Sequence, residues 1–124
     1  MPIEKGIELT RFFEIKEEHS ASHVGSGEVS VLATPSMINF MEETALQCVQ
    51  PHLKDNETTV GVRVDVYHIA PAKVGETLKV VAKLLESDGK RLIFWVEAIC
   101  GDRVIGYGIH ERRVVDREGF TKRA

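Results

Sequence analysis

The sequence has few cysteines, no long apolar run and no excess of one charge, and each lack excludes a class of protein. Its two cysteines, Cys48 and Cys100, lie far apart and form no ligand-spaced cluster, so we expect neither a disulfide framework nor a metal site. No apolar run approaches the roughly 18 residues that a membrane span needs. The first residues, MPIEKGIEL, lack the layout of a signal peptide. We therefore expect a cytoplasmic protein without a membrane partner.

Neither basic nor acidic residues dominate the chain. The 16 lysines and arginines stand against 19 acidic residues, for a formal net charge of −3. A general nucleic-acid binder needs a broad basic face, so we expect no nucleic-acid partner. The chain has 124 residues, of which 43% are hydrophobic, and it contains no repeat or linker at which to divide it. We predict one globular domain over residues 1–124.

Residues 31–53, VLATPSMINFMEETALQCVQPHL, predict one long helix. Thr34 is a suitable N-cap, and Pro35 suits the first helical position. At helical spacing the apolar residues gather on one side: Met37, Ile38, Met41, Ala45, Cys48 and Val49. Glu42 falls inside this apolar arc or at its edge. An unpaired carboxylate in a core costs several kcal/mol, so Glu42 is either a functional group or a boundary residue whose stem packs while its head reaches water.

The rest of the sequence predicts strands over residues 6–16, 58–70, 76–86, 90–100 and 103–115. Residues 19–27 read as a loop, and residues 29–32 as a short extended piece. Short turns at 87–89 and 101–102 imply antiparallel pairing, so we expect the last four strands to form a meander. These elements predict an α+β fold in which a curved antiparallel sheet of five to six strands wraps around one central helix. The strand at 90–100 is apolar on both sides, which indicates a covering second subunit.

The strand over residues 58–70 places a histidine in an apolar row. Val60, Val62, Val64 and Val66 point to one face by the two-residue period, and His68 continues that row. If the helix packs on this face, Glu42 and His68 meet in one pocket. Other interpretations remain open: His68 as a half-buried residue at a strand end, Thr34 as a cap only, and Gly61 as a bulge.

Three segments, VLATPSMINFMEETA, VGVRVDVYHIAPAKVGETL and GIHERRVV, resemble the fluoroacetyl-CoA thioesterase-like family of hotdog-fold proteins over about residues 25–120. The resemblance implies a hotdog fold that pairs as a homodimer or a dimer of dimers, with acyl-CoA sites between subunits. It implies that Thr34, Glu42 and His68 are the catalytic group. It also implies that the backbone N–H of Gly61 receives the thioester carbonyl, and that Arg112 belongs to the substrate site.

The resemblance therefore predicts an acyl-CoA thioesterase that hydrolyses a short or small acyl-CoA to free acid and CoA. Glu42 acts as nucleophile or as the base for water, and His68 orients or protonates. No cofactor is required, since coenzyme A is part of the substrate. An excess of basic residues over 110–123 is compatible with steering of CoA phosphates. The sequence departs from the fluoroacetyl-specific members before the helix: it has HVGSGEVSV, with Glu28, where those members carry phenylalanines that form a lid.

Three other functions remain open on the sequence. The first is a non-catalytic acyl-CoA binding or sensing protein of the same fold. The second is a hotdog hydratase, although these enzymes place an aspartate and a histidine close together on one loop-helix segment, a pattern that is absent here. The third is a purely structural dimer module, which leaves the spacing of Thr34, Glu42 and His68 as coincidence.

Overall fold

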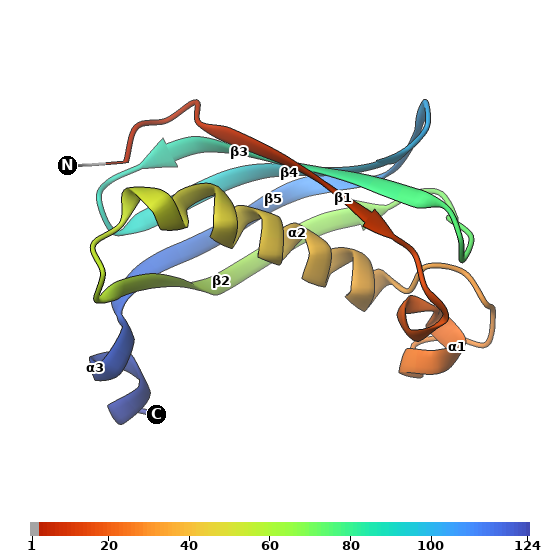
Figure 1. Cartoon of the computed structure of the whole chain (residues 1–124), viewed down its shortest axis with the longest axis horizontal. Helices are drawn as coiled ribbons and strands as arrows, with labels where there is room; N and C mark the ends of the chain where they lie inside the picture. Colours follow the sequence, from red (N-terminus) through yellow and green to blue (C-terminus); the bar gives the residue numbers. More distant parts are fainter. Residues whose placement is uncertain (1–2) are drawn as a thin grey trace.

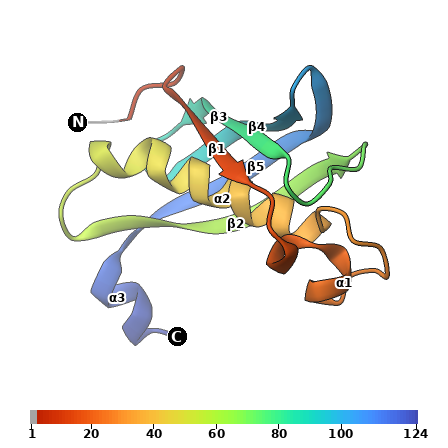
Figure 2. The same cartoon turned by 45° about the vertical axis from the view of Figure 1, so that its right-hand side comes forward.

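One curved antiparallel sheet arches over a single long helix (Figures 1 and 2). The computed structural model describes residues 3–124. Along the chain the elements are β1 (Glu8–Glu14), η1 (Glu17–His19), α1 (Ala21–Val24), α2 (Thr34–Val49), η2 (Gln50–His52), β2 (Glu57–His68), β3 (Thr77–Ser87), β4 (Arg91–Cys100), β5 (Arg103–Asp116) and α3 (Arg117–Lys122). The predicted α+β fold, with one helix inside a curved sheet, is confirmed.

The order of the strands in the sheet is β1-β3-β4-β5-β2. The predicted meander is confirmed for β3, β4 and β5, which are joined by short turns. It is wrong for β2, which pairs with β5 and forms the opposite edge of the sheet. The reason is the connection over residues 69–76, which is too long for a tight hairpin and contains Pro71. It carries the chain away from β2 across the end of the sheet.

A β-bulge divides β2 into two halves. The register with β5 shifts between Gly61 and Arg63, and Val62 is 56% exposed. A bulge adds one residue, so the side chains beyond it change face. Opposed residues of a strand pair share a face, and the pairing therefore puts Thr59, Gly61, Val64, Val66 and His68 on the face toward the helix. The predicted unbroken row of valines is wrong, since Thr59 and Gly61 replace Val60 and Val62 on that face.

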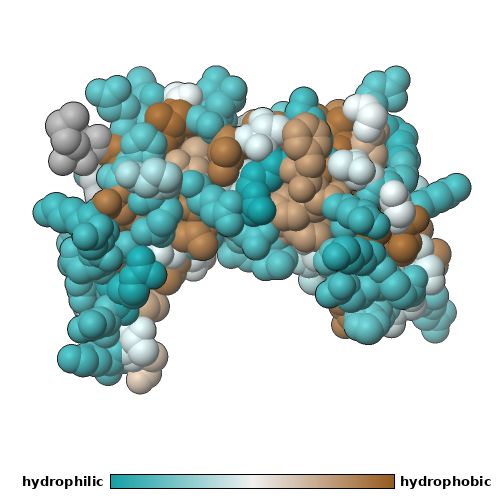
Figure 3. All heavy atoms as spheres, viewed as in Figure 1, coloured by the Kyte–Doolittle hydropathy of each residue, from teal (hydrophilic) through white to brown (hydrophobic). Residues whose placement is uncertain are grey.

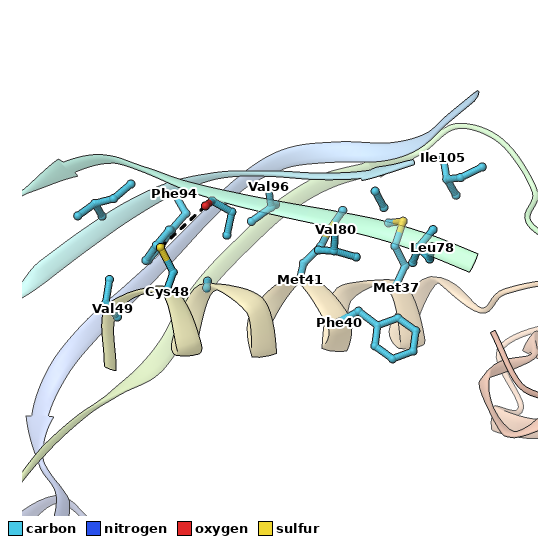
Figure 4. Packing of buried hydrophobic residues seen from close by; sticks show 14 of the residues in the cluster. Met37, Phe40, Met41, Cys48, Val49, Leu78, Val80, Phe94, Val96 and Ile105 are labelled. Atoms are coloured by element: carbon cyan, nitrogen blue, oxygen red, sulfur yellow. Dashed lines mark hydrogen bonds between the residues drawn. The ribbon is translucent and has the colours of Figure 1, made fainter. Parts of the chain in front are cut away.

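The core lies between α2 and the sheet. Met37, Met41 and Cys48 point from the helix toward the strands (Figure 4). On the other side of α2, Phe40 stacks on Phe13 of β1 with ring centroids 4.3 Å apart. Because β1 and η1 cover this second side of the helix, Phe40 is buried, whereas Ile38 of the predicted apolar face is only partly buried.

The chain before α2 is more structured than predicted. The expected loop over 19–27 contains α1, where the Ser20 hydroxyl accepts a hydrogen bond from the backbone N–H of His23. The expected extended piece at 29–32 forms no strand; two isolated bridges, Ser20 to Leu32 and Val31 to Lys73, pair it with neighbouring segments. These bridges hold residues 26–32 beside the start of α2.

The outward side of β4 is partly covered within the chain. The Trp95 ring stacks on Tyr107 of β5 with centroids 5.7 Å apart, and its indole N–H donates to Glu97. Ile93 and Phe94 are buried. The inner side of β4, which includes Phe94, thus packs in the core with α2, and the outward side is covered in part by side chains of the sheet itself. None of the helices within residues 3–124 has the length and apolar content to cross a membrane.

Candidate active site

The start of α2 and the end of β2 bring two predicted residues together. The Thr34 hydroxyl lies 2.7 Å from Nδ1 of His68 and forms a hydrogen bond with it. Thr34 is the first residue of α2 rather than its N-cap, which is Ala33, so the predicted capping role is wrong. Its hydroxyl makes no capping bond and is therefore available to the imidazole.

This pair lines an open cleft of about 360 Å³. The rest of the wall comes from the segments before α2 and after β2, and includes Glu28 and Val29. Burial lowers the pKa of His68 below its ordinary value of 6.5, although a backbone hydrogen bond with Ala70 opposes the shift. The imidazole is therefore mainly neutral at pH 7. In this form it is able to take up a proton or to accept one hydrogen bond.

Glu42 lies farther along α2, at the edge of the apolar face as predicted. Its side chain is 38% exposed. Its carboxylate lies directly over Gly61: a Cβ atom built on this glycine falls 2.6 Å from Oε2 of Glu42. Nη1 of Arg112 lies 3.7 Å from the same oxygen. Glu42 and Arg112 border a second hollow of about 300 Å³, which Asn39 and Leu46 also line.

Arg112 of β5 is fixed by hydrogen bonds to Thr59 of the neighbouring strand β2. It is only 5% exposed. Its Nε donates to the Thr59 hydroxyl at 2.7 Å, and its Nη2 donates to the Thr59 carbonyl at 2.9 Å. Burial lowers the pKa of the guanidinium, and the Glu42 carboxylate opposes this shift. The predicted inclusion of Arg112 in a basic surface that steers phosphates is wrong, because its guanidinium is buried on the side of the sheet toward α2, where Nη1 faces Glu42.

A single chain gathers the predicted residues into two groups rather than one. Thr34 and His68 form the first group, whereas Glu42, Gly61 and Arg112 form the second. Thr34 and Glu42 are eight residues apart on α2, which is a rise of about 12 Å along the helix. The prediction that Glu42 and His68 share one pocket is therefore wrong within a single chain.

The sequence interpretation missed His110 and Thr59. His110 is 1% exposed, and its Nδ1 lies 2.8 Å from the carbonyl oxygen of Arg63. One signal was present: His110 and Arg112 are two residues apart on a strand, so both point to one face. Thr59 was assigned to the opposite face because the bulge was not predicted. Among residues 3–124 no group of three or more metal-ligating side chains comes together.

The fold and these two groups define the class of protein. A five-stranded antiparallel sheet around one central helix is the hotdog fold. A hot-dog-like protein from Thermanaerovibrio acidaminovorans shares it with a TM-score of 0.87 at 20% identity, over 96% of this chain and 88% of that one. The class of fold that the sequence resemblance implied is thus confirmed.

The family follows from the sequence matches. Residues 15–118 match the model of the fluoroacetyl-CoA-specific thioesterase family, and the chain therefore belongs to this family of thioesterase enzymes. It is 36% identical over 91 residues to the fluoroacetyl-CoA thioesterase of Streptantibioticus cattleyicolor, a match over 73% of this chain and 66% of that enzyme. A variant of the fluoroacetyl-CoA-specific thioesterase FlK, in complex with fluoroacetate and CoA, superposes with a TM-score of 0.90 at 30% identity, over 95% of this chain and 99% of that one.

Proposed function

We propose that this protein hydrolyses a small acyl-CoA to the free acid and CoA. Membership of a thioesterase family supports an acyl-CoA thioester as the substrate. The observation that carries the proposal is the half-buried Glu42 carboxylate, which packs on the backbone of Gly61 and faces a fixed Arg112. A core-edge carboxylate held against a bare backbone is costly to build for stability alone, and it suits attack on a carbonyl carbon bound there.

In the proposed reaction Glu42 either attacks the thioester carbon or removes a proton from the attacking water. The carbonyl oxygen gains negative charge and accepts a hydrogen bond from the Gly61 N–H. When Glu42 is the base, the C–S bond breaks and the proton taken from water passes through the Thr34–His68 pair to the leaving CoA thiolate. When Glu42 is the nucleophile, the C–S bond breaks to leave an anhydride on Glu42; water then hydrolyses this anhydride, His68 takes the proton of the water, and that proton ends on the CoA thiolate. Every group in this scheme comes from the chain, water or the substrate. Coenzyme A enters as part of the substrate, and the scheme uses no separate cofactor.

A second copy of the chain is part of this proposal, because one chain separates Glu42 from His68. In the described part of the chain, β2 pairs on one edge only. This edge strand is 12 residues long, and Val62 and Val64 on it are 56% and 39% exposed. A long exposed edge strand is a template for pairing. The side of the molecule below α2, between α3 and α1, is hollowed (Figure 3), which leaves room for a partner.

Symmetric pairing of two β2 strands complements the separation of the two groups. When two identical strands pair antiparallel across a two-fold axis, residue i of one strand lies opposite residue j of the other, and residue j of the first lies opposite residue i of the second. If the axis passes between Val64 and Asp65, Gly61 of one subunit lies opposite His68 of the partner subunit. The Glu42 group of one chain then adjoins the Thr34–His68 group of the other, and each dimer has two complete sites.

The two free, buried cysteines also suit the reducing cytoplasm.

The test is a thiol-release assay with acetyl-CoA, fluoroacetyl-CoA and other small acyl-CoAs. We expect the wild-type protein to release CoA thiol, and Glu42→Gln and His68→Ala each to lose most activity while keeping the wild-type circular dichroism spectrum. The two inactive variants are then unfolded, mixed in equal amounts and refolded. Half of the resulting dimers are heterodimers with one intact site, so a composite site restores up to about a quarter of the wild-type activity.

Each part of the proposal has its own contradicting result. Wild-type turnover in Glu42→Gln shows that the carboxylate is structural. No recovery in the mixture, with heterodimers shown by mass spectrometry, places the whole site within one subunit. A wild-type protein that binds acyl-CoAs without releasing thiol is instead a binding or sensing protein. Mixing Glu42→Gln with the wild type is the matched control for the exchange of subunits.

A further inference from the structure

A buried histidine beside the Glu42 group is not explained by the reaction scheme. His110 lies on β5 at the face toward α2, with its ring centroid 6.5 Å from that of Phe94. Its Nδ1 lies 2.8 Å from the carbonyl of Arg63, and its Nε2 lies 3.1 Å from Nη1 of Arg112. Within residues 3–124 every buried side-chain nitrogen and oxygen has a partner, so both ring nitrogens are engaged.

These two partners determine the protonation of the ring. A guanidinium only donates hydrogen bonds, so Nε2 of His110 must accept the one from Arg112. A carbonyl oxygen only accepts, so Nδ1 must carry the proton and donate to Arg63. The ring is therefore neutral, with its hydrogen on Nδ1. Burial and the cation of Arg112 lower the pKa of His110, against opposing effects of the Arg63 hydrogen bond and the Glu42 carboxylate.

The neutral ring completes a rigid seat for Arg112. The guanidinium makes three hydrogen bonds, two to Thr59 and one to His110, and its Nη1 is the atom that faces Glu42. Thr59 holds Nε and Nη2 only. His110 is thus the partner that determines the direction of Nη1, while Glu42 and Arg112 are the charged groups that face its ring.

We infer that His110 is a positioning residue: its neutral imidazole fixes Nη1 of Arg112, and Arg112 in turn holds the Glu42 carboxylate over Gly61. This role rests on the proposed function, because it matters for the rate only if Glu42 is the reacting carboxylate. It goes beyond that function because it makes His110 responsible for the position of Glu42, a residue that His110 acts on only through Arg112. Misplacement of a reacting group by about 1 Å lowers rates by as much as about 100-fold.

The test compares His110→Phe, which keeps a ring but removes both nitrogens, with His110→Gln, which is able to donate to Arg63 and accept from Arg112. We expect kcat to fall by about 10- to 100-fold in His110→Phe with KM changed by less than about threefold. In His110→Gln we expect most of the loss to be restored. His52→Phe, which changes an exposed histidine far from the site, is the matched control and should keep wild-type kcat.

Nuclear magnetic resonance supplies readouts that do not need activity. In wild type at pH 7 the ¹⁵N shifts of His110 should show a neutral ring protonated on Nδ1, and the Glu42 carboxyl ¹³C resonance should move in His110→Phe but not in His52→Phe. A ring protonated on Nε2 overturns the inference, and so does a Glu42 resonance that does not move in His110→Phe. If His110→Phe does not fold, the Glu42 resonance of His110→Gln is compared with that of Arg112→Lys, and equal positions in these two variants overturn the inference. An inactive wild type contradicts the proposed function instead, and the resonances still decide the role of His110.

Discussion

At the scale of single residues, the site depends on the absence of one side chain. Gly61 is not a turn residue: it lies in β2 opposite Arg112, next to the bulge. A glycine inside a strand weakens it, and often marks the close approach of another group. Here that group is the Glu42 carboxylate, whose Oε2 would lie 2.6 Å from an added Cβ. The glycine therefore sets how closely the acid approaches the strand.

We predict that Gly61→Ala lowers kcat by about 10- to 100-fold, because the methyl group displaces the Glu42 carboxylate from its position. Alanine keeps the backbone N–H, so this variant separates the space at Gly61 from any hydrogen bond that the N–H makes. Steady-state kinetics with acetyl-CoA measure the effect, and a thermal melt checks that the fold persists. A kcat equal to that of the wild type would show that Glu42 has room to move without cost.

Helical periodicity was enough to predict where Glu42 lies, because α2 is regular over its whole length. The same reasoning failed for Gly61 and Thr59. The face of the sheet on which these two residues lie depends on the bulge at Val62, and the residues around the bulge carry no distinctive local signal. Thr34 was misjudged for a different reason: a capping hydroxyl and one that binds His68 have the same sequence pattern. Only the tertiary contact at 2.7 Å distinguishes them.

At the scale of elements, the spans of the strands and of α2 follow from local periodicity and were predicted to within a few residues. Short turns predicted the β3-β4-β5 order for the same reason. The place of β2 at the sheet edge was not predictable in this way, because its partner β5 is distant in sequence. The four-residue helix α1 was also missed, since it shows too little periodicity to be recognised.

The segment from α1 to α2 is the element that shapes the cleft at Thr34 and His68. Small, polar and aliphatic residues line this cleft, among them Val29, Val31 and Ile69, and within the described chain no phenylalanine, tyrosine or tryptophan does so. Glu28 adds the one carboxylate of this wall. A neutral His68 offers no compensating positive charge. An acyl group with its own carboxylate is therefore disfavoured in this cleft relative to a neutral one of similar size.

We predict that the protein hydrolyses acetyl-CoA faster than malonyl-CoA, and that Glu28→Gln narrows this gap in kcat/KM several-fold by raising the malonyl-CoA value. The thiol-release assay at low ionic strength is the measurement, because salt screens an exposed charge. Glu14→Gln, an exposed change on β1, is the matched control and should leave the ratio alone. An unchanged ratio in Glu28→Gln would place the acyl group away from this segment.

At the scale of the whole molecule, two histidines connect the site to the stability of the fold. Burial lowers the pKa of both His68 and His110 below the ordinary value of 6.5. Unfolding exposes them and restores that value, so near pH 6 the unfolded chain binds more protons than the folded one. Stability then rises with pH. Three carboxyls have a pKa that is lowered in the folded state: Glu76, Asp88 and Asp116. They change the free energy of unfolding only at lower pH, as the pH falls below their ordinary pKa values near 4.

We therefore predict that the free energy of unfolding is highest above pH 7 and falls as the pH drops from 6.5 through the lowered pKa values of the two histidines. Urea titrations at pH 7.5, 6.5 and 5.5 measure it, at one fixed protein concentration because association also contributes to stability. His110→Gln removes one titrating group, so its slope over this range should be shallower than that of the wild type. Equal slopes would mean that His110 takes up its proton as readily in the folded protein as in the unfolded chain. That result would also contradict the hydrogen bond from Arg112 to its Nε2, since a ring that binds a second proton has no lone pair left to accept it.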